Sequence, residues 1–278
     1  MKPADYSDIV ERALAEDLSD IGDVTTDSVI DPDARSEAEF RSRQPGVIAG
    51  LDVAAFVFER VDSDVDCQGV VADGDRVIPG QPIAVVRGLA RSILTSERTA
   101  LNLLGRISGV ATATARLVDA VRGTGVLISD TRKTMPGLRV LDKHAVLIGG
   151  GVNHRMGLYD AVLIKDNHIA AAGDISAAVA AARQSVGPDV MVEVEVDNLD
   201  QLSVVLTTDA DGVLLDNMDV DTLRDAVAMA GDRITTEASG GITHDNVRTI
   251  AETGVDVISV GWITHSAPQL DIGLDFVS

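Results

Sequence analysis

The chain has 278 residues and a formal net charge of −21 at pH 7, with 44 Asp and Glu against 23 Lys and Arg. A surface this acidic repels nucleic-acid phosphates, which argues against a nucleic-acid-binding protein. Hydrophobic residues make up 45% and aromatic residues 3%, so we expect a core of Val, Ile, Leu and Ala. That composition suits strands covered by helices on both faces.

The single cysteine, Cys67, cannot form a disulfide within the chain, and no Cys and His spacing indicates a metal site. We interpret it as a small buried hydrophobic residue. No apolar stretch reaches the roughly 18–20 residues of a membrane span. The first residues lack the basic-then-apolar pattern of a signal peptide. We therefore expect a cytoplasmic protein with no membrane partner.

The first part of the chain predicts a mixed domain. Residues 5–17 have helical apolar spacing, and a long helical pattern covers residues 92–121. Between these helices, turn residues separate short strand-like runs at 34–42, 46–49, 65–71 and 82–88. This mixture indicates an α+β domain that ends in the long helix.

From residue 125 the pattern becomes regular. Helical stretches are expected at 174–186, 198–206, 219–230 and 243–253. They alternate with apolar runs at 126–129, 161–164, 190–194, 212–215, 234–236 and 257–260. Repeated strand–helix units predict a parallel sheet, and six runs are enough for an α/β barrel, with an open doubly wound sheet as the alternative.

Polar residues follow the carboxyl end of each predicted strand. They are Asp130 to Lys133, Lys165, Glu195, Asp216, Ser239 to Gly241, and Gly261. In α/β barrels this rim carries the active site, so we expect these side chains to share one pocket.

The rim residues suggest what the pocket binds. Arg132, Lys133, His154, Arg155 and Lys165 would form a cationic wall suited to carboxylate or phosphate. Glu195 and Asp216 would face it and bind magnesium or sugar hydroxyls, although Asp216 could instead cap a helix. The glycine turns at 239–241 and 260–261 could cradle a phosphate. A phosphorylated sugar with magnesium and a small acid with several carboxylates fit this description.

Three segments closely resemble quinolinate phosphoribosyltransferases: residues 130–139 (DTRKTMPGLR), 149–155 (GGGVNHR) and 163–168 (LIKDNH). The likeness extends, in consistent order, to residues 22–26, 96–102, 193–196, 215–217 and 239–241. Nearly the whole chain is covered.

The resemblance implies an N-terminal α/β sandwich domain (1–110) and an incomplete α/β barrel of parallel strands (111–265), with the tail 266–278 packed on the first domain. It implies transfer of a phosphoribosyl group from phosphoribosyl pyrophosphate to quinolinate with decarboxylation. The products would be nicotinate mononucleotide, pyrophosphate and CO2, in NAD biosynthesis. Mg²⁺ would be required, and no organic cofactor.

The same resemblance implies residue roles. Quinolinate would be held by Thr131, Arg132, His154, Arg155 and Lys165, and by Arg98 inserted from the other subunit of an obligate dimer. Phosphoribosyl pyrophosphate would be held by Lys133, Glu195, Asp216, Ser239, Gly240, Gly241, Val260, Gly261 and Trp262. Lys133, Lys165, Glu195 and Asp216 would be the catalytic residues, with Glu195 and Asp216 serving Mg²⁺.

Two residues depart from the family pattern: Ala238 stands where a larger or hydroxylated residue is common, and Trp262 where a small one is usual. An inward-pointing Trp262 would narrow the phosphate pocket. Of the other basic residues, His144 is interpreted as packed or at the surface and His168 as a cap for Lys165. Lys143 is expected to pair with acids on the surface.

Two alternatives stay open. One is a paralogue of the same fold that acts on a different acid, which the full set of cations from Arg98 to Lys165 disfavours. The other is a non-catalytic anion-binding barrel, which would have no need of the paired Glu195 and Asp216.

The acidic residues also predict a salt dependence, because 34 are Asp, 10 are Glu, and only 4 Lys accompany 19 Arg. Salt screens repulsion between exposed carboxylates, so a halophilic protein should melt at higher temperature in molar KCl than in dilute buffer. A melting temperature that is higher at low salt would contradict this hypothesis.

Overall fold

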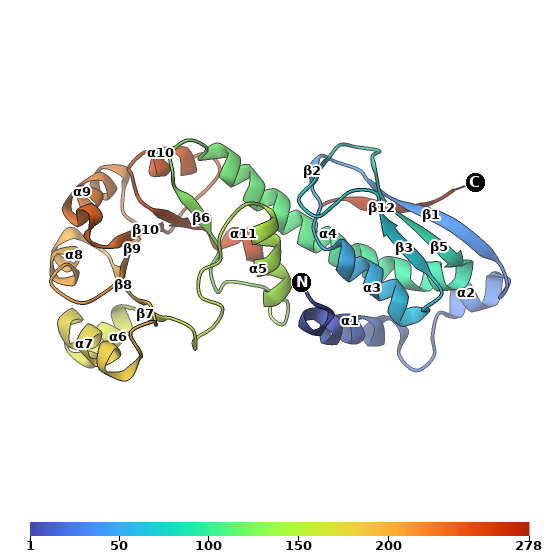
Figure 1. The fold of residues 1–278 in the computed structure, drawn as a ribbon, viewed down its shortest axis with the longest axis horizontal. Helices are drawn as coiled ribbons and strands as arrows, with labels where there is room; N and C mark the ends of the chain where they lie inside the picture. The colour runs from blue at the N-terminus through green and yellow to red at the C-terminus, as the bar shows by residue number, and fades with distance from the viewer. Residues whose placement is uncertain (278) are drawn as a thin grey trace. The chain divides into compact units, whose positions relative to one another are not determined.

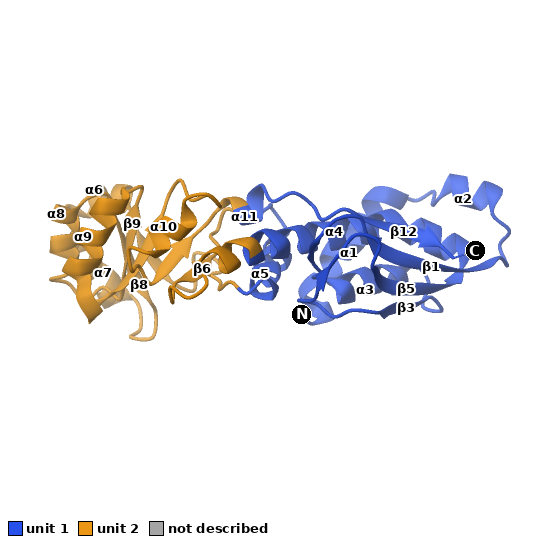
Figure 2. Ribbon diagram, turned by 90° about the horizontal axis from the view of Figure 1, so that it is seen from above, with its two compact units in different colours: residues 1–115, 134–150, 263–278 blue, residues 116–133, 151–262 orange. Residues whose placement is uncertain are grey.

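The computed structural model describes residues 1–277 and divides into two compact units (Figure 2). The first contains Met1–Ala115, Thr134–Gly150 and the chain from Ile263 onward; the second contains Arg116–Lys133 and Gly151–Trp262. The two units therefore alternate along the chain. The domain limits at residues 110 and 265 stay a prediction.

An antiparallel sheet organises the first unit (Figure 1). Its strand order is β12, β1, β5, β3, with bounds Ile272–Phe276, Arg35–Ser42, Pro82–Leu89 and Asp66–Gly69. Strand β12 pairs with β1, with Leu274 opposite Phe40, so the sheet joins residues far apart in sequence. Strands β2 (Gly46–Val47) and β4 (Arg76–Val77) form a second, two-stranded sheet.

Aromatic side chains connect the layers of the first unit. Phe58 of α3 (Leu51–Val61) meets Phe40 of β1 edge to face at a centroid distance of 5.9 Å. Tyr6 of α1 (Pro3–Leu18) meets Phe56 on the same helix α3 at 5.4 Å. Helix α3 therefore packs against both the sheet and α1. The remaining helices are α2 (Val24–Val29), α5 (Arg139–Ile148), α11 (Trp262–His265) and the long α4 (Ala90–Ala120).

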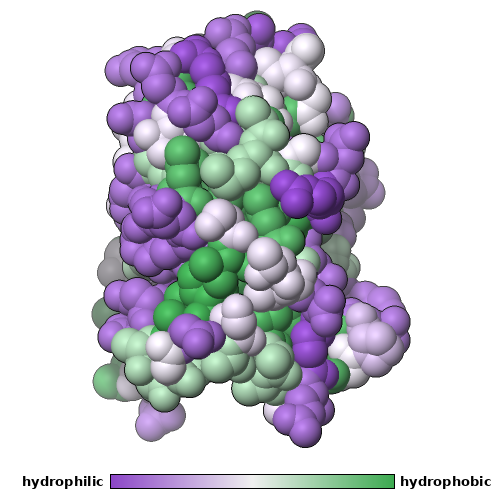
Figure 3. Space-filling view, turned by 90° about the vertical axis from the view of Figure 1, so that its left-hand side faces the viewer, coloured by the Kyte–Doolittle hydropathy of each residue, from purple (hydrophilic) through white to green (hydrophobic). Residues whose placement is uncertain are grey.

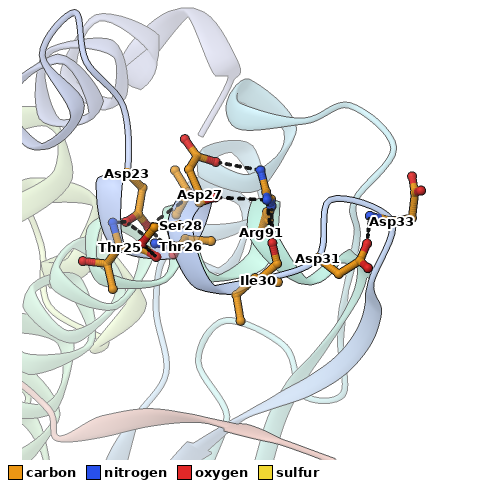
Figure 4. A network of polar contacts seen from close by, with 10 residues as sticks. Asp23, Thr25, Thr26, Asp27, Ser28, Ile30, Asp31, Asp33 and Arg91 are labelled. Carbon is orange, nitrogen blue, oxygen red and sulfur yellow. Dashed lines mark hydrogen bonds and ion pairs between the residues drawn. The ribbon is translucent and has the colours of Figure 1, made fainter.

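Residues 22–26, one of the segments that resemble the family, form a helix cap at Asp23 (Figure 4). The Asp23 carboxylate accepts hydrogen bonds from the backbone N–H groups of Thr25 and Thr26, which lie in the first turn of α2. At the other end of α2, Arg91 of α4 donates to the carbonyl of Ile30. This segment thus fixes α2 on α4 within the first unit.

A buried ion pair ties together three segments of the first unit. Arg106 of α4 lies 2.9 Å from the carboxylate of Asp142 on α5, and the two side chains are 12% and 1% exposed. Asp142 also accepts from the backbone N–H of Met135, and Arg106 donates to the carbonyl of Thr264. The prediction that Lys143 lies at the surface is wrong. Lys143 is 1% exposed because it lies in the buried part of α5, residues 141–146.

Six parallel strands form the sheet of the second unit (Figure 1), in the order β6, β11, β10, β9, β8, β7. Their bounds are Leu127–Ser129, Val257–Ser259, Thr235–Ser239, Gly212–Asp216, Val192–Val196 and Val162–Ile164. Within the described residues no pairing joins β6 to β7. The sheet is therefore the parallel sheet of an incomplete α/β barrel, as the sequence predicts.

Helices follow the strands and contact one another in sequence order, from α6 to α10. Their bounds are Asp166–Ala172, Ile175–Ser185, Leu199–Val205, Val220–Ala230 and Val247–Ala251, with a short 3-10 helix at Gly231–Arg233. Asp174, Asn198 and Asp219 cap α7, α8 and α9 by accepting a backbone hydrogen bond three residues on. Some of the chain's many Asp residues thus stabilise the N-termini of helices.

Figure 3 shows the molecule from the left-hand side of Figure 1. Hydrophobic residues gather in the middle of this face, and hydrophilic residues surround them. Among the described residues, no helix combines the length and apolar character needed to cross a bilayer.

The buried ion pair makes a stability prediction. Asp142→Ala leaves Arg106 buried without its counter-charge, which should lower the free energy of unfolding by about 3–5 kcal/mol. Urea unfolding followed by circular dichroism measures this change. Asp221→Ala breaks the exposed pair with Arg224 and is the matched control, with little expected effect. Equal effects of the two substitutions would contradict the assignment.

Candidate functional site

The carboxyl ends of the parallel strands enclose one cavity of about 310 Å³, which lies wholly within the second unit. Most of the lining residues come from the six strands or from the loops that follow them, and two come from the loop between α5 and β7. The lining residues are Thr131, Arg132, Lys133, His154, Arg155, Leu163, Lys165, Glu195, Leu214, Asp216, Glu237, Ser239 and Ser259. Nine of the predicted site residues are thereby brought together.

A short backbone junction assembles one cationic wall. Ser129, the last residue of β6, forms an isolated parallel bridge with Val152. The next residue, Asp130, is fully buried, and its carboxylate accepts from the backbone N–H of His154 at 2.9 Å. These contacts place the loop after β6, which carries Arg132 and Lys133, beside the loop that carries His154 and Arg155.

The cations of this wall lie close enough to repel one another. Burial, and then repulsion from Arg132, lowers the pKa of the Arg155 guanidinium. Asp160 and Glu193 oppose that shift. Arg155 also donates to the carbonyl of Ala161 at 3.2 Å, which fixes its direction. Two neighbouring guanidinium groups in a partly buried cavity favour an anion between them.

Lys165 and the two predicted carboxylates form another part of the lining. Lys165 precedes α6, and its ammonium group pairs with the carboxylate of Glu195 at the end of β8. Its backbone N–H donates to Nδ1 of His168 at 3.0 Å, so His168 caps this turn. Asp216 ends β9 and accepts from the side-chain amide of Asn217 at 2.7 Å.

The turn after β10 requires glycine. Gly240 has φ +94°, and a Cβ there would lie 2.1 Å from the side-chain oxygen of Asn217. Ser239 precedes it and lines the cavity, whereas Gly240, Gly241, Val260, Gly261 and Trp262 are not among the lining residues. Of the predicted phosphate cradle, the structure therefore places only Ser239 on the cavity wall.

The two departures from the family pattern leave the cavity open. The Trp262 indole N–H donates to the carbonyl of Ile242 at 3.0 Å, and Trp262 does not line the cavity. Ala238 is 1% exposed and alternates with Glu237 and Ser239, so it faces the opposite side of β10.

Arg98 lies on α4 in the first unit and is not among the lining residues of the cavity in the second unit. Its predicted role in a partner subunit's site stays a prediction.

A group of buried acids at the cavity floor was not predicted from the sequence. Nε2 of His154 lies 3.1 Å from Glu193 and 3.7 Å from Glu237. Glu193 and Glu237 are 3% and 5% exposed. Each lies two residues before a rim residue that was identified, Glu195 and Ser239. Since side chains two apart in a strand share a face, this periodicity was the signal that could have found them.

His154, Glu193 and Glu237 each offer one potential ligand atom within 4.8 Å of the others, which is the geometry of a metal site. The hydrogen bonding of the ring argues against that use. The backbone N–H of Arg155 donates to Nδ1 of His154 at 2.8 Å, so Nδ1 carries the lone pair and Nε2 carries the proton. Nε2–H then donates to Glu193, so this ring has no lone pair at Nε2 to offer to a cation.

Both parts of the chain match family models. Residues 23–108 match the N-terminal domain of quinolinate phosphoribosyl transferase, and residues 110–275 match its C-terminal domain. A nicotinate-nucleotide pyrophosphorylase (carboxylating) of Mycobacterium leprae is 48% identical over 274 residues, covering 96% of each chain. A quinolinate phosphoribosyltransferase (decarboxylating) of Nicotiana tabacum is 42% identical, covering 97% of this chain and 82% of that one.

Solved structures agree with the sequence relatives. The nicotinate-nucleotide pyrophosphorylase of Francisella tularensis superposes with a TM-score of 0.96 at 38% identity, covering 100% of this chain and 98% of that chain. That of Ehrlichia chaffeensis gives 0.94 at 40% identity, covering 98% of both. The motifs, the parallel sheet with its rim cavity, and these likenesses have one explanation: the chain belongs to the quinolinate phosphoribosyltransferase family.

Proposed function

We propose that the chain transfers the phosphoribosyl group of phosphoribosyl pyrophosphate to quinolinate with decarboxylation. The products are nicotinate mononucleotide, pyrophosphate and CO2, formed in NAD biosynthesis. The observation that carries the proposal is one cavity lined by Arg132, Arg155 and Lys165 together with Glu195 and Asp216. The names of the relatives support the same reaction.

Quinolinate carries two carboxylates on a pyridine ring and binds to the cationic wall. Arg132 and Arg155 take the carboxylates, because a guanidinium group matches a carboxylate with two parallel hydrogen bonds. Thr131 and Lys165 complete this part of the lining. His154 lies beside them with its Nε2–H directed at Glu193, so it acts mainly by fixing the wall.

Phosphoribosyl pyrophosphate occupies the side of the cavity with the carboxylates. Lys133 holds the pyrophosphate as a compact point charge, and Glu195 and Asp216 face the ribose hydroxyls. Ser239 and the turn through Gly240 and Gly241 hold the 5′-phosphate, with residues 260–262 beyond it. Glu195 is already paired with Lys165, so each substrate must compete with this ion pair on entering.

The carboxylates also fit Mg²⁺, which prefers oxygen ligands and keeps several waters. Glu195 and Asp216 would hold it, directly or through water. When bound, Mg²⁺ would neutralise the negative charge that develops on pyrophosphate as it leaves.

The chain's own residues then act by placement and by charge. Departure of pyrophosphate leaves positive character at the anomeric carbon, which Glu195 and Asp216 stabilise, and Lys133 stabilises the departing anion. The ring nitrogen of quinolinate attacks the same carbon once Arg132 and Arg155 have aligned it. The nitrogen becomes positive, so it can accept the charge left by the departing carboxylate without an organic cofactor.

We propose that the enzyme is a cytoplasmic homodimer in which Arg98 of one subunit completes the quinolinate site of the other. The chain's acidic surface suits a salt-rich cytoplasm. Arg98 lies on α4 and is not one of the residues that line the cavity, and the family resemblance supports its role in the partner's site.

The reaction is tested by incubating the protein with quinolinate, phosphoribosyl pyrophosphate and MgCl2 at several KCl concentrations. Arg132→Ala should raise KM for quinolinate about 10–100-fold, with a much smaller effect on phosphoribosyl pyrophosphate, because a charged hydrogen bond is lost. The assay follows nicotinate mononucleotide by chromatography. Arg224→Ala, on the exposed face of α9, is the control. Equal losses for both substrates would show that the wall is misassigned.

The shared site predicts complementation between two inactive chains. Mixing an Arg98→Ala chain with a Lys165→Ala chain and allowing subunit exchange should restore about a quarter of wild-type activity, since half of the dimers are hybrids with one intact site. Each variant alone should stay inactive. Absence of recovery, with exchange verified by mass spectrometry of tagged chains, would contradict a shared site.

A further inference from the structure

Glu237 is a buried carboxyl group that reaches the substrate cavity. It lies on β10 two residues before Ser239, is 5% exposed, and lines the cavity. Its Oε1 atom has no hydrogen-bond partner among the described residues. A buried polar atom in this state is costly, so a position that retains one calls for a functional explanation.

The groups around Glu237 favour its protonated form. Facing it are Glu193 from β8, His154, Asp130 after β6, and Ser259 from β11. Burial, followed by repulsion from Glu193, raises the pKa of Glu237 to about 7, while His154 and Ser259 act in the opposite direction. Nε2–H of His154 donates to Glu193, so this proton does not reach Glu237. Burial and the neighbouring acids therefore favour the neutral carboxyl form of Glu237.

The proposed reaction needs a proton inside the cavity. When the carboxylate at C2 of the ribosylated ring leaves as CO2, the electrons of the broken C–C bond stay on C2. That carbon must gain one proton to give nicotinate mononucleotide. Arg132 and Arg155, which hold the ring, keep their own protons because guanidinium groups do not release them at neutral pH. Glu237 lines the same cavity and holds a proton it can release.

We propose, on the basis of the function proposed above, that Glu237 is the catalytic acid that protonates C2 after decarboxylation. The C2–carboxylate bond breaks and CO2 leaves with no electron pair. The pair on C2 takes the proton of the Glu237 carboxyl group, forming C2–H. Glu237 becomes a carboxylate and regains a proton from solvent before the next turnover.

Glu237→Gln separates proton donation from packing. The amide has the size of the neutral carboxyl group and can donate a hydrogen bond, but it cannot release a proton. In a single turnover with quinolinate labelled in its C2 carboxylate, pyrophosphate should appear at a rate within about threefold of wild type. Without a proton donor, the carbanion at C2 recaptures CO2 before CO2 leaves the cavity. Labelled CO2 and nicotinate mononucleotide should therefore form about 100-fold more slowly, the low end of the usual contribution of acid–base groups. N-ribosylated quinolinate should accumulate.

Glu237→Asp is the matched variant, because it keeps an ionisable proton on a shorter side chain. It should form nicotinate mononucleotide faster than Glu237→Gln. The melting temperature of Glu237→Gln should not fall, since the amide buries no charge.

Three outcomes would overturn the proposal. Nicotinate mononucleotide formation by Glu237→Gln at near wild-type rate would mean that the group only packs the floor. Parallel loss of pyrophosphate and CO2 release would assign it to substrate positioning. A pH dependence of nicotinate mononucleotide formation that is the same in wild type and Glu237→Gln would exclude Glu237 as the donor. Failure of the proposed function is distinct, because wild-type protein would then release neither product from quinolinate.

Discussion

The site depends on the two-residue period of parallel strands that end at a common rim. On β8 the valines at 192, 194 and 196 are buried on one face, while Glu193 and Glu195 point to the other. The same alternation on β10 separates Ala238 from Glu237 and Ser239. One set of positions thus forms the core under the helices, and the other set lines a polar cavity. A shift of one residue in any strand would exchange the two.

Charge is arranged in depth within this cavity. The less buried layer holds Arg132, Lys133 and Lys165, which we propose contact the substrates, together with Glu195 and Asp216. The buried layer holds the acids Asp130 and Glu193. Asp130 accepts a hydrogen bond from the backbone N–H of His154, and Glu193 accepts one from the His154 ring. The deeper acids therefore hold in place the loop whose cations would otherwise repel one another.

The apolar runs and the helical patterns were enough to predict the six parallel strands, most helices and the rim residues. They missed α3 because Leu51–Val61 lies between short strands in an irregular stretch. They also missed the burial of Lys143, which depends on how α5 packs in the first unit. Glu193 and Glu237 had a visible signal, but strand residues below the rim are usually assigned to packing. Whether a buried acid reaches a cavity depends on three-dimensional placement, which a single sequence does not report.

The pairing of β12 with β1 has a consequence for how the molecule folds. During synthesis β1 leaves the ribosome long before β12, and until then one edge of the first sheet has unpaired N–H and C=O groups. Such an edge can accept a strand from another copy of the chain, a route to misassembly that grows with the delay. Two features of β1 disfavour such pairing with an apolar strand. Arg43 pairs with Asp275 across the junction with β12, and charged residues stand at every second position of the strand, at Glu37, Glu39 and Arg41.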